Sequence, residues 1–166
     1  GALAPTDFDY ELPVGSLMKF FRRDISDFSR SRSYVAPQPA RVAKFLSRLS
    51  GVRQDKKLVG ICWRSGLLTP TRNSEYTNLL DWAGLLARDD VSFVNLQYGD
   101  SSQELAEARA VLGAEIVDWP DLDLKRDMDD VFALISCLDL VVTVRTTVNN
   151  MAGAVGTPCA LLIKGT

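Results

Sequence analysis

Two threonines beside an arginine stand where an apolar stretch meets the start of a helical pattern. Arg145, Thr146 and Thr147 follow the run 140–144, and apolar residues recur at helical spacing from 148 to 155. The first N–H groups of a helix have no partner within the helix, and the helix dipole favours an anion at that end. A phosphate group fits this chemistry. Alternatively, Thr146 simply caps the helix while Arg145 lies in solvent, and the residues alone leave both interpretations open.

A second polar loop follows the apolar stretch 58–62. Trp63, Arg64 and Ser65 place a cation and a hydroxyl there, and a glycine follows at position 66. These residues could face another part of the same ligand, although a turn can require glycine for conformational reasons alone. The loop is neither a G-x-G-x-x-G nor a Walker A sequence, which disfavours nicotinamide-dinucleotide binding and P-loop hydrolysis.

Three further side chains end apolar stretches later in the chain. Gln97 and Tyr98 offer an amide and a phenol after the stretch 91–96, where ordinary turn residues are the alternative. Trp119 could stack on a nucleobase, whereas core packing is the more common fate of a large aromatic residue at a strand end. We include all three among the candidate ligand-binding residues.

The composition excludes several kinds of chemistry. The 166 residues include no histidine, which removes His-based triads, imidazole bases and His-ligated zinc. The net charge of −2 disfavours a nucleic-acid partner, and the Ser/Arg-rich stretch 29–33 is interpreted as a solvated linker rather than an RNA-binding tail. The acidic residues between 121 and 130 lack the calcium-loop spacing and suit a helix start. We therefore expect no metal and no cofactor.

The cysteines indicate a reducing compartment. All three lie far apart in apolar stretches, and no two form a C-x-x-C pair. Buried free thiols are the expected state, which is typical of cytoplasmic proteins. Because no apolar run is long enough to span a membrane, we expect a cytoplasmic location without a membrane span.

The elements that must position these loops alternate along the chain. Apolar runs at 58–63, 91–97, 114–119, 140–144 and 158–164 predict five strands, and amphipathic patterns predict helices between them. One of these helices is expected to begin with a capping box from Ser101 to Glu104 and to end at Gly113. Alternation with short connections requires parallel strands with helices on both faces.

We therefore expect an α/β fold with a doubly wound, Rossmann-like sheet over residues 57–166. A helical approach segment over 1–56 precedes it, with Val42, Phe45, Leu46 and Leu49 on one helix face. In such sheets a ligand binds outside the carboxyl ends of the strands, where the strand order reverses. All the candidate loops lie at that edge.

These residues resemble a known family, the carboxyl-terminal half of B-type glycosyltransferases. The resemblance is to the bacterial enzymes that accompany tetratricopeptide repeats and are similar to heptosyltransferases and O-GlcNAc transferase. The matching segments, in chain order, are Gly15-Ser16-Leu17, Val59-Gly60-Ile61-Cys62-Trp63-Arg64-Ser65-Gly66, Val94-Asn95-Leu96-Gln97-Tyr98-Gly99, Asp129-Asp130-Val131-Phe132-Ala133-Leu134-Ile135, Leu138-Asp139-Leu140-Val141-Val142-Thr143-Val144 and Ala152-Gly153-Ala154-Val155-Gly156-Thr157-Pro158. In the family this half binds the nucleotide-sugar donor.

The resemblance implies roles for individual residues. Thr146 and Thr147 match positions that hold the donor pyrophosphate, and the loop from Trp63 to Ser65 matches the one that faces the phosphates. The heptosyltransferase pattern Asp-Thr-x-x-x-His is changed here, since Arg145 and Asn150 stand at the Asp and His positions. Arg145 could pair with the pyrophosphate instead.

Two hypotheses follow from the resemblance and its departures. In the first, the chain is the donor-binding portion of a metal-independent glycosyltransferase that uses a nucleoside-diphosphate sugar and a protein or glycan acceptor, and it is inactive alone because the acceptor-binding half is missing. In the second, it is a non-catalytic binding or scaffold module with a glycosyltransferase-like sheet. A Rossmann oxidoreductase is disfavoured because the dinucleotide fingerprint is missing.

Overall fold

The computed structural model describes residues 9–28, 33–65 and 76–163, and the chain divides into two units, Gly1–Ser31 and Arg32–Thr166. In the first unit the described elements are η1 (Val14–Leu17), α1 (Met18–Phe21) and η2 (Ile25–Asp27). None of the residues in these three short elements is buried. Most of the Ser/Arg-rich stretch and Gly66 lie outside the described residues.

The second unit contains the sheet. Its elements, in chain order, are α2 (Pro39–Arg53), β1 (Lys57–Cys62), η3 (Leu79–Trp82), α4 (Ala83–Leu86), β2 (Val91–Asn95), α5 (Ser102–Leu112), β3 (Ile116–Val117), α6 (Met128–Ser136), β4 (Leu140–Val144), α7 (Thr147–Val155) and β5 (Cys159–Leu162). The five strands lie in the order β3-β2-β1-β4-β5, and all four pairs are parallel. The predicted doubly wound, Rossmann-like fold is confirmed, with the order reversing between β1 and β4.

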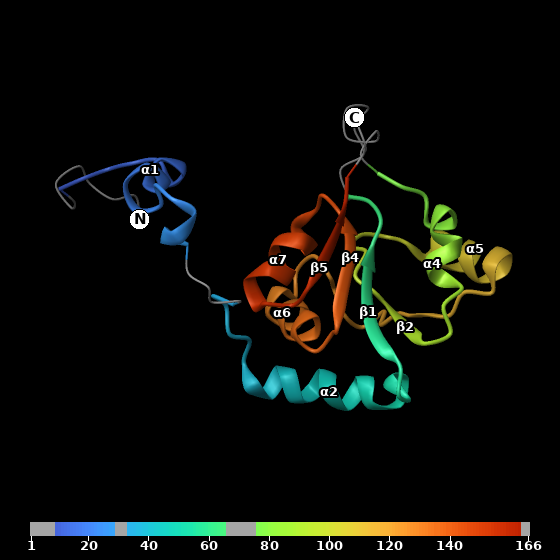
Figure 1. Cartoon of the computed structure of the whole chain (residues 1–166). Coiled ribbons are helices and arrows are strands. Elements are labelled where there is room, and N and C mark those ends of the chain that lie inside the picture. The colour runs from blue at the N-terminus through green and yellow to red at the C-terminus, as the bar shows by residue number, and fades with distance from the viewer. Residues whose placement is uncertain (1–8, 29–32, 66–75, 164–166) are drawn as a thin grey trace. The chain divides into compact units, whose positions relative to one another are not determined.

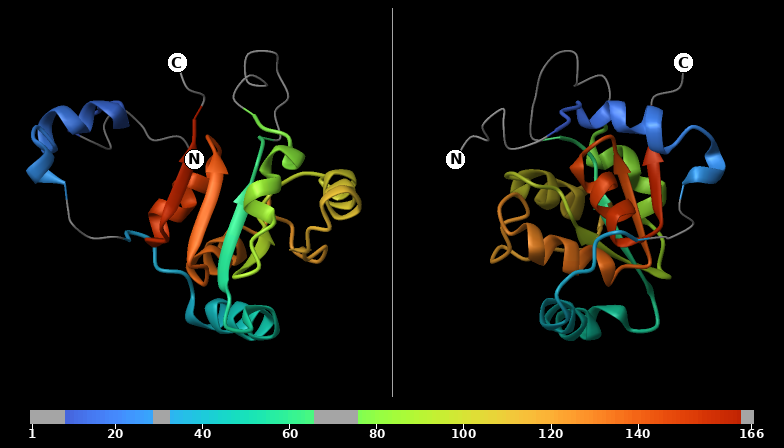
Figure 2. Two further views of the ribbon diagram at one scale, coloured as in Figure 1. Left: turned by 45° about the vertical axis from the view of Figure 1, so that its right-hand side comes forward. Right: turned by 90° about the vertical axis from the view of Figure 1, so that its left-hand side faces the viewer.

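Helices cover the sheet on both faces, with α4 and α5 on one side and α6 and α7 on the other (Figures 1 and 2). Because side chains alternate along a strand, β1 contributes to two separate cores. Leu58 and Cys62 pack on the α6 side, whereas Ile61 and Trp63 pack on the α5 side. This double burial explains why β1 is apolar at every position after the exposed Lys57.

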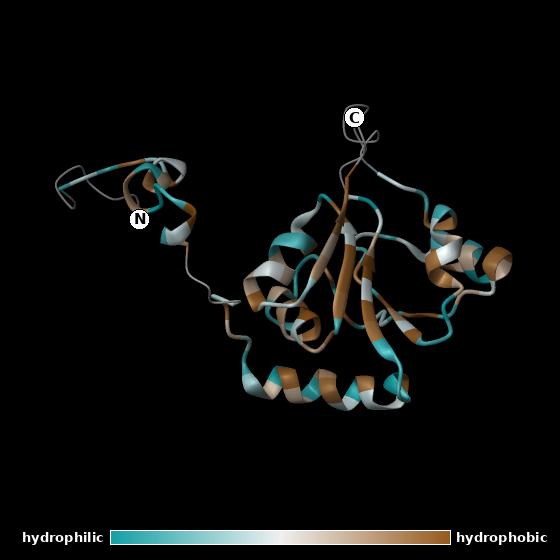
Figure 3. Cartoon of the chain, viewed as in Figure 1, coloured by the Kyte–Doolittle hydropathy of each residue, from teal (hydrophilic) through white to brown (hydrophobic). Residues whose placement is uncertain are grey.

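Helix α2 belongs with the sheet unit and not with a separate approach segment. The structure divides the chain after residue 31, whereas the sequence predicted a boundary at 57. The physical reason is that α2 buries Phe45 completely and Leu49 almost completely in the core on the α6 side. Leu46, which the predicted stripe included, is 53% exposed instead. Figure 3 shows apolar and polar bands alternating along this helix.

The predicted end of α5 at Gly113 and its N-cap position at Ser101 are confirmed, while the predicted capping box is wrong. Gly113 and Gly156 adopt left-handed φ values of 63° and 81° after α5 and α7, which glycine permits without strain. At the start of α5, however, Ser101 makes no side-chain capping bond. Its Oγ instead accepts a hydrogen bond from Asn95 Nδ2 at 3.4 Å, and the Glu104 carboxylate turns toward the loop after β1.

Strand β5 is apolar and lies at one edge of the described sheet. It pairs with β4, and all four of its residues are exposed. Among the residues that the structure describes, no helix has the length and apolar character needed to cross a membrane.

Candidate functional site

The loops after β1, β2 and β4, together with Leu161 of β5, surround a cavity of about 440 Å³ at the amino-terminal end of α7, which we call the α7 cavity. Its lining residues are Ser65, Tyr98, Arg145, Thr146, Thr147, Asn149, Asn150 and Leu161. Six of the ten residues predicted from the sequence are therefore brought together there. The cavity lies beside the point where the strand order reverses, because its walls include the loops after β1 and β4.

Thr146 is the N-cap of α7, and Thr147 is the first residue of the helix. The Thr146 Oγ1 accepts a hydrogen bond from the N–H of Val148 at 3.3 Å, so the predicted N-cap is confirmed. The same hydroxyl lies 3.2 Å from the hydroxyl of Thr143, at the end of β4. Thr146 is buried, whereas Thr147 is exposed on the first turn. The capping hydroxyl is thus occupied within the protein, and the Thr147 hydroxyl is the one available to a ligand.

A buried thiol connects this cap to the neighbouring strands. Cys62 Sγ, at the end of β1, lies 3.7 Å from Thr146 Oγ1 and 3.6 Å from Gln97 Oε1. Burial raises the pKa of the Cys62 thiol to about 11, so the group stays protonated near neutral pH. The ends of β1, β2 and β4 are therefore held together by neutral polar contacts beneath the α7 cavity.

Trp63 and Arg64 do not line the α7 cavity. The Trp63 indole is fully buried, and its Nε1 donates to Glu104 Oε1 at 2.8 Å. The Arg64 guanidinium donates to both carboxylate oxygens of Glu104 and to the carbonyl of Asp100. Burial raises the pKa of Glu104, but the hydrogen bonds from Arg64 and Trp63 outweigh burial and leave this pKa below its usual value. Trp63 and Arg64 were expected to face phosphate, but in this structure their side chains bind Glu104 of α5 and so fix the loop after β1 to that helix.

Gln97 acts on the same loop through its side-chain amide. Its Oε1 accepts the backbone N–H groups of Trp63 at 3.2 Å and Arg64 at 3.0 Å, and its Nε2 donates to the Tyr98 carbonyl. Only 1% of Gln97 is exposed. The next residue, Tyr98, donates from its hydroxyl to Ser65 Oγ at 3.1 Å. These contacts set the position of Ser65 at the edge of the α7 cavity.

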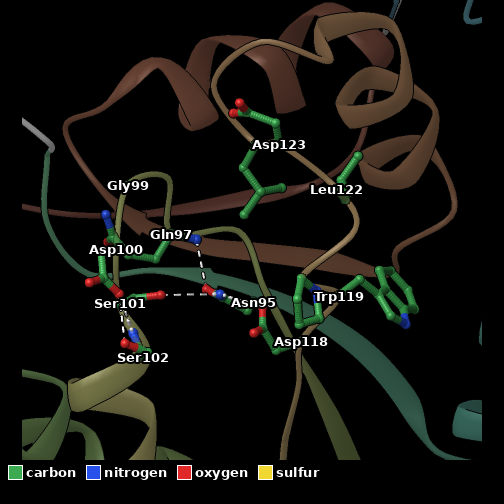
Figure 4. Close-up of a pocket in the computed structure, with 12 residues that line it drawn as sticks. Asn95, Gln97, Gly99, Asp100, Ser101, Ser102, Asp118, Trp119, Leu122 and Asp123 are labelled. Carbon is green, nitrogen blue, oxygen red and sulfur yellow. Dashed lines mark hydrogen bonds between the residues drawn. The ribbon is translucent and has the colours of Figure 1, made fainter.

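A second cavity, of about 340 Å³, lies at the carboxyl ends of β2 and β3 and is called the β2–β3 cavity here (Figure 4). Its lining residues are Asn95, Gln97, Gly99, Asp100, Ser101, Ser102, Asp118, Trp119, Pro120, Leu122, Asp123 and Leu124. Three carboxylates and no lysine or arginine occur in this set. The sequence reasoning missed Asn95 and Asp118, which are joined by a 2.9 Å hydrogen bond. The signal that could have found them is a polar residue directly at the end of an apolar strand.

The Trp119 indole packs on α2. The Arg48 guanidinium lies over the indole at 4.6 Å, and the Phe45 ring centroid lies 5.9 Å from the indole centroid at an interplanar angle of 44°. Figure 4 shows the indole pointing away from Asn95 and Asp123. The ring is therefore placed for packing on α2, and it does not face the cavity in which a base could stack.

The described residues contain no group of three or more acidic or cysteine side chains arranged to hold a metal ion. The lining groups of the α7 cavity that can stabilise an anion are the N–H groups at the start of α7, the hydroxyls and Arg145.

Comparison with known proteins gives one sequence relative and two structural neighbours. Protein FlbA of Caulobacter vibrioides is 38% identical over 155 residues, which are 93% of this chain and 26% of FlbA. The chain thus spans about a quarter of the length of this relative. No family model matches the sequence.

The structural neighbours are both sugar-transferring enzymes by name. The E. coli ADP-heptose LPS heptosyltransferase II matches with a TM-score of 0.58 and 15% identity, over 86% of this chain and 44% of the enzyme. A family 9 glycosyl transferase of Veillonella parvula matches with a TM-score of 0.60 and 13% identity, over 80% and 37%. The fold is that of the matched portion of these glycosyltransferases. It agrees with the resemblance seen in the sequence motifs.

Proposed function

We propose that this chain is the donor-binding portion of a glycosyltransferase that moves a sugar from a nucleoside diphosphate to an acceptor. The observation that carries the proposal is the α7 cavity, in which Arg145 and the Thr147 hydroxyl meet the start of a helix at the ligand-binding edge of the sheet. The likeness to a heptosyltransferase named for ADP-heptose supports a donor of the same chemical class.

The charges of the two cavities support an orientation for the donor. The α7 cavity contains Arg145 and several hydroxyl and amide groups, which suits a diphosphate. The β2–β3 cavity is lined by Asp100, Asp118 and Asp123, which would repel phosphate. An uncharged nucleoside suits the second cavity, because ribose hydroxyls and base amines can donate to those carboxylates. Gln97 lines the β2–β3 cavity, and the adjacent Tyr98 lines the α7 cavity. The loop after β2 would therefore lie between the nucleoside and the diphosphate of the donor.

The chemical contribution of this half would be to stabilise the leaving diphosphate. As the bond to the sugar breaks, negative charge grows on the phosphate oxygens, and fixed N–H donors and Arg145 oppose that charge without rearranging. The group that activates the acceptor must come from outside this set, since the chain has no histidine and the α7 cavity contains no carboxylate. A protein or glycan acceptor, an association with tetratricopeptide repeats, a relationship to O-GlcNAc transferase, a bacterial source and a cytoplasmic location remain predictions of the sequence.

A non-catalytic scaffold is the second candidate function. Arg145 and Asn150 replace the acidic and histidine positions of the heptosyltransferase pattern, which is the observation that favours it. In this case the sheet would keep its shape while the α7 cavity had lost its ligand.

Calorimetric titration of the full-length protein with ADP, UDP, GDP and CDP tests the proposal. We expect at least one of them to bind, and the Arg145→Ala variant to bind it about 10- to 100-fold more weakly, the scale of a charge-assisted hydrogen bond. Arg88→Ala is the matched control, because Arg88 pairs with Asp90 away from both cavities and should leave the affinity unchanged. Absence of binding by all four nucleotides would favour the scaffold. Sugar-nucleotide turnover that Thr147→Ala reduces in a folded protein would rule the scaffold out.

A further inference from the structure

The segment 118–124, called the wall here, lines one side of the β2–β3 cavity and contacts α2 through Trp119 and Asp121. Most residues of this segment line the cavity, and the Trp119 ring packs on Arg48 and Phe45 of α2. Arg48 of α2 covers the indole with its guanidinium and donates two hydrogen bonds to Asp121, at 2.8 Å from Nη1 and 2.6 Å from Nη2. One guanidinium thus contacts two residues of the wall, on either side of Pro120.

Other contacts hold the two ends of the wall. Asn95 Nδ2 donates to Asp118 Oδ1 at 2.9 Å, and the Asp123 N–H donates to Asp127 Oδ2 at 3.1 Å. The Leu122 N–H donates to the Trp119 carbonyl at 2.9 Å, which closes a turn, and Leu122 itself is buried in the core. Asp121 and Asp123 are exposed. The preceding strand, β3, has only two residues, Ile116 and Val117, so it restrains the loop weakly at its start. Between these ends, the orientation of the turn depends on the burial of Leu122 and on the Trp119 and Asp121 contacts with α2.

We propose that Arg48 is a positioning residue for nucleoside binding: by holding Trp119 and Asp121 it sets the shape of the β2–β3 cavity without touching the ligand. The inference rests on the proposed function, because it takes a nucleoside as the occupant of that cavity. The contact demands arginine, since a planar guanidinium can stack on a ring and bind a carboxylate with two parallel hydrogen bonds, whereas the ammonium of lysine cannot do both.

Two measurements test this role, and the same helix provides a matched control. Arg41 also lies on α2, but its guanidinium pairs with Asp130 of α6 rather than with the wall. The Arg41→Ala and Arg48→Ala variants therefore both remove an α2 ion pair, and only the second releases the wall. The first measurement is hydrogen exchange of the amides from 118 to 124 in the full-length protein, which requires no ligand. The second is calorimetric titration with the nucleoside diphosphate that binds best and, separately, with inorganic pyrophosphate.

We expect Arg48→Ala to speed exchange in residues 118–124 and to weaken nucleotide binding at least fivefold, with pyrophosphate binding unchanged within twofold. Arg48→Lys should restore less than half of the lost nucleotide affinity, and Arg41→Ala should change neither the exchange of the wall nor the ratio of the two affinities. Equal weakening of nucleotide and pyrophosphate, or equal effects of the two arginine variants, would overturn the positioning role while leaving the proposed function intact. If the unaltered protein binds pyrophosphate but no nucleotide, or binds neither, the proposed function fails and the inference fails with it.

Discussion

Removal of the Thr146 hydroxyl should destabilise the fold, whereas removal of the neighbouring Thr147 hydroxyl should not. In Thr146→Ala the N–H of Val148 loses its capping acceptor, which costs about 1 kcal/mol. The buried Thr143 hydroxyl loses a partner 3.2 Å away, a further cost of about 0.5–1.5 kcal/mol. The expected loss is about 2 kcal/mol of unfolding free energy. For a chain of this length it corresponds to a fall in Tm of about 4–8 °C.

Thr147 provides the comparison within the same turn. Because its side chain is exposed and has no capping role, Thr147→Ala should change the free energy of unfolding by less than about 0.5 kcal/mol. It should nevertheless weaken nucleotide and pyrophosphate binding, because the α7 cavity loses a hydroxyl donor. Thr146→Ser keeps the cap and should lose only about 0.8 kcal/mol for the missing methyl group.

Urea unfolding followed by far-UV circular dichroism, with calorimetric titration of each folded variant, measures both effects. The reasoning is refuted if Thr147→Ala costs as much stability as Thr146→Ala and neither variant changes binding. In that event both hydroxyls would have structural roles only, and the proposal that the α7 cavity binds phosphate would be refuted.

Three other changes have expected outcomes. The pKa of Glu104 is lowered in the fold. Its ionised carboxylate therefore stabilises the protein above its unfolded pKa of about 4.3, and this stabilisation is lost as the pH falls through the lower folded pKa. In Glu104→Gln, the free energy of unfolding measured in urea should consequently fall less between about pH 5 and pH 3. In the native protein at pH 8 a disulfide reagent should modify the exposed Cys159 quickly and the buried Cys62 only after unfolding, with Cys159→Ser removing the fast phase. Gly60→Ala would place a Cβ 2.7 Å from a Leu138 methyl group and should cost about 1–3 kcal/mol in chemical denaturation, whereas Gly153→Ala, with open space around it in α7, should be neutral or stabilising.

Features set by neighbours in the chain could be predicted from the sequence. The capping role of Thr146 depends on residues two positions away, and the strand at 140–144 needs only its own apolar run. The parallel order follows from the short connections, which exclude most alternatives. Local signals were sufficient for these features because the competing interactions are few.

Features set by distant partners could not be predicted in this way. Glu104 has the position of a capping-box residue, but its carboxylate binds Trp63 and Arg64, about 40 residues earlier, because a buried indole N–H and a guanidinium need an acceptor. Trp119 ends a strand as a stacking residue would, yet its ring finds Arg48 across the fold. The residues adjacent to Glu104 and Trp119 in the sequence do not indicate these distant partners.

The open side of β5 has a practical consequence for work on isolated pieces of this protein. A strand whose outer N–H and C=O groups face no other strand is a template for the backbone of a second molecule, and apolar side chains strengthen such pairing. Leu161 and Leu162 are 41% and 40% exposed along this edge, and β5 contains no charged residue to discourage contact. Samples in which this edge is exposed are therefore prone to associate through β5. Measurements on the monomer should accordingly be made at low protein concentration.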